Sequence, residues 1–149
     1  MKKIAIGTDH SAVELKSQII DYLESKGYIL SDEGAYTDDS CDYPDYALKV
    51  AKKVQKGDAA RGILICGTGI GMAIAANKVK GILAAVCTNT LMAEMTRKHN
   101  NSNVLCLGVR VSSHRDILEM IDTWLETEYE EGRHRYRLNK ISDIENSKL

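Results

Sequence analysis

Cys66 is the residue whose sequence surroundings best suit chemistry. It ends the short apolar run 62–66, and Gly67-Thr68-Gly69-Ile70-Gly71 follows, with a helix expected to begin near Ile70. Glycines let the backbone approach a ligand closely, and the first N–H groups of a helix attract anions. Such donors stabilise a phosphate or a developing oxyanion, and they would also favour the thiolate of Cys66. The alternative is a cysteine that fills a strand end beside a tight glycine turn.

This glycine stretch does not match other anion-binding loops. A phosphatase loop would carry an arginine a few residues after the cysteine, where Ile70, Gly71 and Met72 stand. A P-loop needs Gly-Lys followed by Ser or Thr, a triplet that the sequence lacks. A dinucleotide fingerprint follows the first strand and has an acidic residue about 20 positions later, whereas these glycines follow the third apolar run. NAD is therefore not expected.

Polar residues also follow the other apolar runs. Asp9-His10 come after the first run, Thr88-Asn89-Thr90 after the fourth and Arg110 after the fifth. Parallel sheets bind ligands outside the carboxyl ends of their strands, so we expect these loops to supply one small-molecule site. Tyr43, held before the only proline, either lines that pocket or helps to begin a helix.

Two basic segments stand apart from these loops. One contains His99 and Asn100, and the other contains Arg133, His134 and Arg137. Helical spacing puts Arg133 and Arg137 on one face, which suits a phosphate held from two directions. A solvated basic turn is an equally good interpretation of the arginines, and His99 alone would be read as a cap or surface histidine.

The positions of these residues depend on alternating elements. Short apolar runs, expected to be strands, cover residues 3–7, 28–31, 62–66, 83–87 and 104–108. Helical apolar spacing covers residues 13–25, 46–54, 72–79, 91–98 and 117–128, and Gly27, Gly57 and Gly81 are expected to close three of these helices. This alternation predicts one α/β domain, residues 1–141, with a five-stranded parallel sheet and helices on both faces. Residues 142–149 are predicted to form a polar tail.

Composition narrows the classes of function. The 149 residues are 44% hydrophobic and 28% charged, with a formal net charge of −1, so nothing favours nucleic acid or a membrane as partner. The four cysteines are widely spaced and form no CxxC pair, which predicts reduced thiols in the cytoplasm. No group of His, Asp and Glu stands at metal-ligand spacing, so no metal is expected.

Taken together, several motifs resemble those of type B ribose-5-phosphate isomerases. They are Gly7-Thr8-Asp9-His10, Asp42-Tyr43-Pro44-Asp45-Tyr46, Ile65-Cys66-Gly67-Thr68-Gly69-Ile70-Gly71, Ala75-Ala76-Asn77-Lys78-Val79, His99-Asn100-Asn101-Ser102-Asn103 and Gly132-Arg133-His134. The resemblance runs from residue 3 to about residue 141. It implies a flavodoxin-like fold, cofactor-free interconversion of ribose 5-phosphate and ribulose 5-phosphate, and a homodimer or dimer of dimers whose active sites are built from both subunits.

The resemblance also implies roles for individual residues. Cys66 corresponds to the base that moves a proton between C1 and C2, and Thr68 with the amides of Gly67 through Gly71 to the anion hole of the enediolate. His99 corresponds to the acid that opens the sugar ring, and Asp9 to the group that handles hydroxyl protons. The expected phosphate-side ligands are His10, Arg133 and Arg137, with Asn100, Arg110 and His134 nearby. Met72 stands where another branch of the family has a glutamate, which places the chain in the cysteine branch.

Two departures from the family pattern leave the sugar open. Thr88-Asn89-Thr90-Leu91 replaces the commoner His-Asp-Thr-aromatic stretch, and Ser112-Ser113 replaces a commoner Ile-Gly. A hexose-6-phosphate isomerase of the allose or galactose type is therefore an alternative. A non-catalytic sugar-phosphate sensor and a redox-sensing thiol protein are rivals from other classes.

Overall fold

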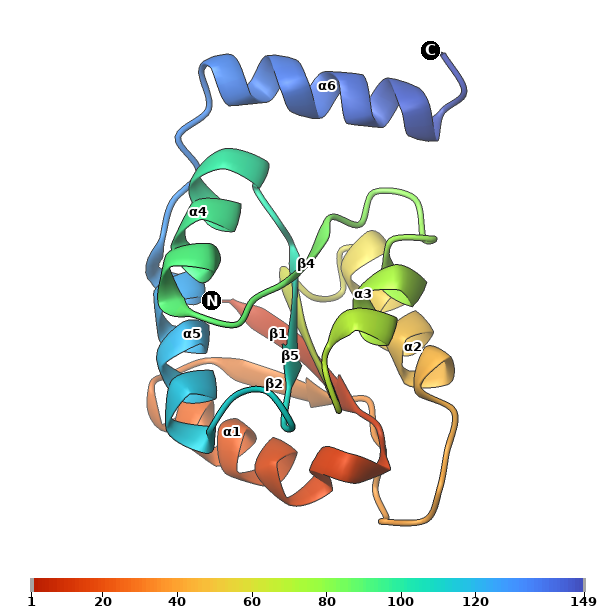
Figure 1. Ribbon diagram of the computed structural model, residues 1–149, viewed down its shortest axis with the longest axis vertical. Coiled ribbons are helices and arrows are strands. Elements are labelled where there is room, and N and C mark those ends of the chain that lie inside the picture. The colour runs from red at the N-terminus through yellow and green to blue at the C-terminus, as the bar shows by residue number, and fades with distance from the viewer. Residues whose placement is uncertain (1, 149) are drawn as a thin grey trace.

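The computed structural model describes residues 2–148 and has the predicted three layers, with one parallel sheet between two layers of helices (Figure 1). The strands are β1 (Lys3–Thr8), β2 (Ile29–Asp32), β3 (Arg61–Cys66), β4 (Ala84–Val86) and β5 (Val104–Gly108). The helices are α1 (Val13–Ser25), α2 (Tyr43–Gln55), α3 (Ile70–Ala76), α4 (Thr90–Asn100), α5 (His114–Glu126) and α6 (Arg133–Glu145), with a short 3-10 turn η1 (His10–Ala12) before α1.

The strand order is β2-β1-β3-β5-β4. The expected flavodoxin-like architecture is confirmed, but the last two strands are exchanged relative to the flavodoxin order 2-1-3-4-5. The chain goes from β1 to β2 on one side and then crosses back to β3 on the other side of β1. The strand order therefore reverses between β1 and β3, and a crevice opens at the carboxyl ends of these two strands. The exchange also places β5, rather than β4, beside β3.

Alternate strand residues point to opposite faces of the sheet and build two cores. Ile4, Ile6, Ile63 and Ile65 pack under α1, α4 and α5, around the fully buried Trp124. Leu64, Cys66, Val104 and Cys106 face α2 and α3. Because β3 is buried on both faces after its first residue, Arg61, its sequence from Gly62 to Cys66 is continuously apolar, as expected for a central parallel strand.

Helix α6 is the element that apolar periodicity did not predict. It crosses the end of the molecule at which α4 ends, and it exposes Tyr136, Ile141 and Ile144 (Figure 1). A groove of about 590 Å³ separates it from the segment 81–85 and α4. The helix continues to Glu145, past the predicted start of a polar tail at residue 142.

Two other boundaries differ from expectation for local reasons. Helix α3 ends at Ala76, and Gly81 lies beyond it in a turn rather than at its cap. Asp42, not Tyr43, is the extended residue before α2, because Pro44 is accommodated in the first turn where its missing N–H costs nothing. Within residues 2–148, no helix is long and apolar enough to cross a membrane.

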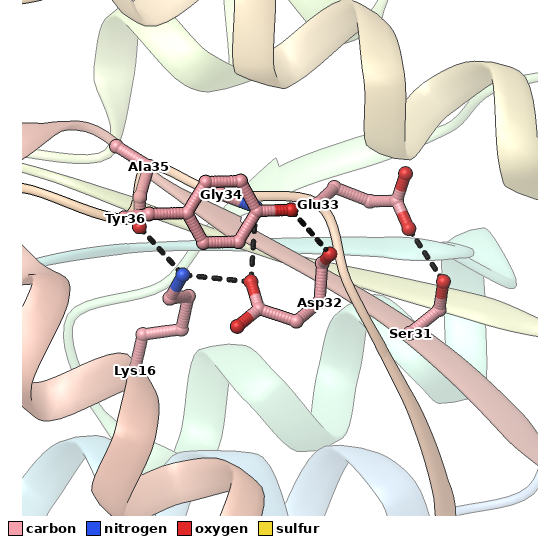
Figure 2. A network of polar contacts seen from close by, with 7 residues as sticks. All are labelled: Lys16, Ser31, Asp32, Glu33, Gly34, Ala35 and Tyr36. Atoms are coloured by element: carbon pink, nitrogen blue, oxygen red, sulfur yellow. Dashed lines mark hydrogen bonds and ion pairs between the residues drawn. The ribbon is translucent and has the colours of Figure 1, made fainter.

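A buried lysine holds the loop between β2 and α2 (Figure 2). The Lys16 ammonium donates to Asp32 Oδ1 at 2.7 Å and to the carbonyl of Ala35 at 2.6 Å, and it lies 4.6 Å from the centre of the Tyr36 ring. The N–H of Gly34 also donates to Asp32 Oδ1. Since Thr8 exchanges backbone hydrogen bonds with Gly34 and Ala35, the network fixes the start of this loop against the carboxyl end of β1.

We predict that Asp32→Asn lowers the free energy of unfolding, because it leaves the Lys16 ammonium, only 3% exposed, without its counter-ion. Breaking a buried pair costs about 3–5 kcal/mol, and the 37% exposure of Asp32 reduces the expected loss to roughly 2–3 kcal/mol. Urea unfolding at equal protein concentration measures it. Asp38→Asn, the same charge change at an exposed position, is the control; equal stability of the two variants would contradict a structural role for the pair.

Candidate active site

A pocket of about 540 Å³ opens at the carboxyl ends of β1 and β3, where the strand order reverses. Three of the four loops expected from the sequence meet there. The lining residues are Asp9, His10, Ser11, Tyr43, Cys66, Gly67, Thr68, Ile70, Gly71, Ile74 and Arg110. The pocket therefore combines a thiol, a carboxylate, an imidazole, hydroxyls and a guanidinium.

Cys66 lies at the base of the glycine loop, as predicted. The N–H of Gly69 donates to its Sγ at 3.2 Å, and the side chain is nearly buried. Gly69 makes this contact with a φ of +82°, in the left-handed region that favours glycine, and its position leaves no room for a Cβ beside Leu107. This contact holds the Cys66 sulfur against the start of the glycine loop.

Two other buried cysteines belong to the same half of the sheet, Cys106 in β5 beside β3 and Cys87 after the edge strand β4. Burial raises the pKa of Cys87 to about 11 and also raises the pKa of Cys106, which holds both as thiols near neutral pH. Neither lines the pocket. Among the four free cysteines, Cys66 lines the pocket, whereas the half-buried Cys41 lies beside His10 and is not part of the lining.

The rest of the loop is partly occupied by its own contacts. The N–H of Ile70 donates to Thr68 Oγ1 at 3.3 Å, so the hydroxyl hydrogen of Thr68 is left to donate elsewhere. Gly71 has no side chain, which allows the ring of Tyr43 to lie against the start of α3; a Cβ there would be 2.6 Å from that ring. Of the amides expected to form an anion hole, those of Gly69 and Ile70 already have partners.

The first loop contributes two polar groups in fixed orientations. Asp9 Oδ1 accepts from both the N–H and the hydroxyl of Ser11, which caps the turn after β1. His10 Nδ1 accepts from the N–H of Cys41 at 3.3 Å. With Nδ1 as acceptor, the neutral ring carries its proton on Nε2, where it can donate to an anion.

Arg110 reaches the pocket because of the exchanged strand order. β5 lies beside β3, and the backbone N–H of Arg110 donates to the carbonyl of Gly67. The loop after β4 is displaced to the sheet edge, and Thr88, Asn89 and Thr90 do not line the pocket, contrary to expectation.

Both departures from the family pattern begin helices. Asn89 caps α4 by accepting from the N–H of Met92 at 2.8 Å, and Ser113 caps α5 by accepting from the N–H of Asp116 at 3.1 Å. Asn and Ser are favoured at this position because their short side chains satisfy a free N–H of the first turn. Local helix capping therefore accounts for these two residue types.

The second group of expected site residues lies at the other end of the strands, beyond their amino ends. α4 begins beyond the carboxyl end of β4 and runs back along the sheet for about 16 Å, so His99 and Asn100 lie near the amino ends of the strands. The α5–α6 loop and the start of α6, which carry Arg133, His134 and Arg137, lie at the same edge (Figure 1). Within one chain, these five residues do not line the Cys66 pocket.

This second group is itself held together. The imidazoles of His99 and His134 stack, with ring centres 4.2 Å apart and planes 12° from parallel. Burial lowers the pKa of His134, and the nearby His99 and Arg133 lower it further. Arg97, buried under the end of α4, donates to the carbonyls of Ser102 and Thr127 and so joins α4 to the segment before α6.

Sequence reasoning missed Ser11 and Ile74 as lining residues, and Cys41 as the partner of His10. Ser11 directly follows Asp9-His10, and Ile74 lies one helical turn after Ile70, so spacing could have indicated both. Cys41 gave no signal, because its contact spans the long loop between β2 and α2.

The comparisons with known proteins agree with this geometry. The family model for ribose/galactose isomerases matches residues 4–141. The ribose-5-phosphate isomerase B structure of Clostridium thermocellum is 51% identical, with a TM-score of 0.96 and coverage of 99% of each chain. The chain belongs to the ribose/galactose isomerase family. It is an isomerase, which confirms the predicted class of enzyme over a sensor or a redox protein.

Two curated relatives show that members this similar differ in named substrate. The ribose-5-phosphate isomerase B of Escherichia coli is 45% identical over 145 residues, which is 97% of each chain. The D-erythrulose-4-phosphate isomerase of Pectobacterium atrosepticum is 44% identical over 146 residues, covering 97% of this chain and 96% of that protein. Family membership alone therefore does not fix the sugar.

We predict that Cys66→Ala lowers kcat by roughly 10²–10⁴, the usual contribution of a positioned acid–base group. Cys66→Ser should be nearly as inactive, because a hydroxyl is a much weaker acid than a thiol. Steady-state kinetics and circular dichroism measure activity and fold, and Cys87→Ala, which removes a buried thiol outside the pocket, is the control. A Cys66→Ser variant with more than about a tenth of wild-type kcat would show that position 66 supplies size rather than acidity, and Asp9 would become the candidate base.

Proposed function

We propose that the enzyme interconverts ribose 5-phosphate and ribulose 5-phosphate through an enediolate, with Cys66 as the base. The observation that carries the proposal is the Cys66 sulfur, which lines the pocket and accepts the N–H of Gly69. An aldose–ketose isomerase needs one group that removes a proton and returns it, together with donors for the oxyanion and a fixed phosphate. The pocket contains residue types suited to each task.

The proposed steps use groups already placed. The Cys66 thiolate removes the proton from C2 of the open-chain aldose, and the electrons move to the carbonyl oxygen at C1. The Thr68 hydroxyl and the amides of Gly67 and Gly71 donate to the enediolate oxygens. Asp9, its Oδ1 fixed by Ser11, moves the hydroxyl proton between O2 and O1. The Cys66 thiol then returns its proton to C1, which yields the ketose and restores the thiolate.

The two departures from the family pattern give no reason to prefer a hexose phosphate over a pentose phosphate. Since Asn89 and Ser113 cap helices, neither residue type requires a different sugar. Tyr43, packed on Gly71, closes one wall of the pocket, and Ile70 and Ile74 border another. A hexose 6-phosphate isomerase remains the second candidate, and the erythrulose phosphate relative adds a four-carbon sugar to the comparison.

We predict that kcat/KM for ribose 5-phosphate exceeds that for allose 6-phosphate, galactose 6-phosphate and erythrulose 4-phosphate by at least about tenfold, a difference of 1.4 kcal/mol in transition-state binding. Coupled or direct assays of the four sugars at one pH measure it. A tenfold preference for another sugar phosphate would overturn the pentose assignment while leaving the role of Cys66 intact.

We also propose that the working enzyme is a homodimer in which each active site takes residues from both subunits. Within one chain, the Cys66 pocket and the His99 group lie at opposite edges of the sheet, separated by the length of α4. Ring opening by His99 and phosphate binding by Arg133 and Arg137 at the Cys66 pocket would therefore require a second copy. A dimer of dimers, in which two such homodimers pair, is the alternative assembly.

Exposed apolar side chains support this arrangement. Ile70 and Ile74 line the pocket and are each more than half exposed, and Leu91 at the start of α4 and Ile144 on α6 are both 63% exposed. Apolar groups gathered on one region of surface mark interaction sites, and a two-fold dimer would cover both regions at once. The open groove beneath α6 gives the partner chain a place to pack.

Mixed dimers test the shared site. A Cys66→Ser chain paired with a His99→Asn chain should regain about half of wild-type turnover, because one of its two sites then has both wild-type residues. Each variant alone should be nearly inactive on ribose 5-phosphate. Two affinity tags allow the heterodimer to be purified after co-expression.

A heterodimer no more active than its parents would place Cys66 and His99 in one subunit's site. A monomer by light scattering with full activity would also contradict the proposal. An active His99→Asn homodimer would instead remove His99 from the reaction, so the outcomes separate the assembly from the role of the histidine.

We further propose a cytoplasmic location, with no nucleic acid or membrane partner. All four cysteines are free in the structure, which suits a reducing compartment.

A further inference from the structure

Three metal-ligand side chains meet at the amino edge of the sheet, outside the Cys66 pocket. They are His99 at the end of α4, Glu130 in the α5–α6 loop and His134 in the first turn of α6. One ligand atom from each lies within 4.8 Å of the others. Their spacing in the sequence, 31 and 4 residues, hid this group, which only the tertiary structure assembles.

The backbone around these side chains is fixed. The N–H of Glu130 donates to the carbonyl of Lys98 at 3.1 Å, next to His99. Arg97 binds the carbonyl of Thr127, which holds the same loop against the end of α4. Because two contacts next to the group join these segments, an ion would need to move side chains rather than the backbone.

The donor set fits one class of ion. Two imidazoles and one carboxylate are ligands that Zn²⁺ accepts, and three protein ligands leave a fourth position for water. Zinc–ligand bonds of about 2.0–2.1 Å require ligand atoms about 3.3 Å apart. The side chains must therefore close by roughly an ångström, and the imidazoles must turn out of their stack. His99 is half-buried and Glu130 exposed, so an ion has access from solvent.

Some charges around the three side chains favour a bound cation, and others oppose it. The Glu130 carboxylate supplies negative charge. Arg133, Arg137 and Lys98 lie nearby and oppose a cation, which indicates reversible rather than structural binding.

We propose that Zn²⁺ binds His99, Glu130 and His134 and inhibits the isomerase by removing His99 from ring opening. The site is inhibitory, not catalytic, so the reaction itself needs no metal. Its inhibitory consequence rests on the proposed function of His99, whereas binding itself does not.

Zinc binding is measured by calorimetry on the full-length enzyme, in a phosphate-free, non-chelating buffer without sugar. We expect one Zn²⁺ per chain, with affinity reduced about tenfold or more in Glu130→Gln and in His134→Gln. Glu128→Gln, an equal charge change at an exposed position two residues earlier, should bind as the wild type does. Cobalt should give the visible absorption of a tetrahedral site, and Mg²⁺, which prefers six oxygen ligands, should give no heat.

The same variants are then assayed with ribose 5-phosphate. Zinc should inhibit the wild type and Glu128→Gln over the concentrations at which it binds, and Glu130→Gln should resist, with unchanged activity in the absence of zinc. Without added zinc, a chelator should leave the wild-type rate unchanged.

Several results would overturn the site. One is the absence of binding at about 100 μM Zn²⁺, which would mean a binding free energy weaker than about 5.5 kcal/mol. Another is equal zinc affinity in Glu130→Gln and Glu128→Gln. Binding lost in Cys66→Ser would place the ion on the thiol instead. Zinc binding without inhibition would support the site but refute its effect on His99. An enzyme that is inactive on ribose 5-phosphate would refute the proposed function, and calorimetry would still decide whether zinc binds.

Discussion

β3 is buried on both faces between β1 and β5, and each group that lines the Cys66 pocket is placed relative to its carboxyl end. Hydrogen bonds to β1 bring Asp9 and His10 to one side of Cys66, and hydrogen bonds to β5 bring Arg110 to the other. The glycine loop leaves the strand in the only direction that remains open and returns as α3. If β3 shifted by one residue, Cys66 would point into the opposite core.

The glycines that follow β3 allow neighbouring groups to come close to the backbone. Gly69 adopts a conformation open to glycine so that its N–H meets the Cys66 sulfur, and Gly71 leaves room for the Tyr43 ring. The Lys16 network at the start of the β2–α2 loop supports the pocket without lining it. It fixes one end of the loop that carries Cys41 to His10, so a buried ion pair contributes to the orientation of an imidazole in the pocket.

The length of α4 sets a second constraint. A helix that starts at the carboxyl edge of a sheet and spans it must end at the amino edge, so His99 cannot reach the Cys66 pocket of its own chain without unwinding. The same geometry gathers His99, Glu130 and His134 at that edge. One chain thus presents two chemically different regions, and the apolar surface beside each of them is what an association between copies would bury.

The sequence by itself determined the five strands, the helices α1 to α5 and most of the residues that line the Cys66 pocket. Its apolar runs and helical spacing predicted the five strands to within one residue, because local burial patterns are written directly in the order of residues. Cys66, Thr68, Asp9, His10, Tyr43 and Arg110 were identified from their places at strand ends and from the family resemblance. Helix α6 has only a short apolar row, Leu138, Ile141 and Ile144, in an otherwise polar sequence, and this row was too weak a periodic signal to indicate the helix.

Tertiary structure alone decided the order of the last two strands, and with it which loops reach the pocket. No local pattern distinguishes β5 beside β3 from β4 beside β3, because both strands are short, apolar and parallel, and the choice depends on how α4 and α5 pack together. That choice brought Arg110 in and left Asn89 to cap a helix. It was also the long-range packing of α4 against the α5–α6 loop, invisible in residue spacing, that separated His99 from Cys66 and placed it against His134.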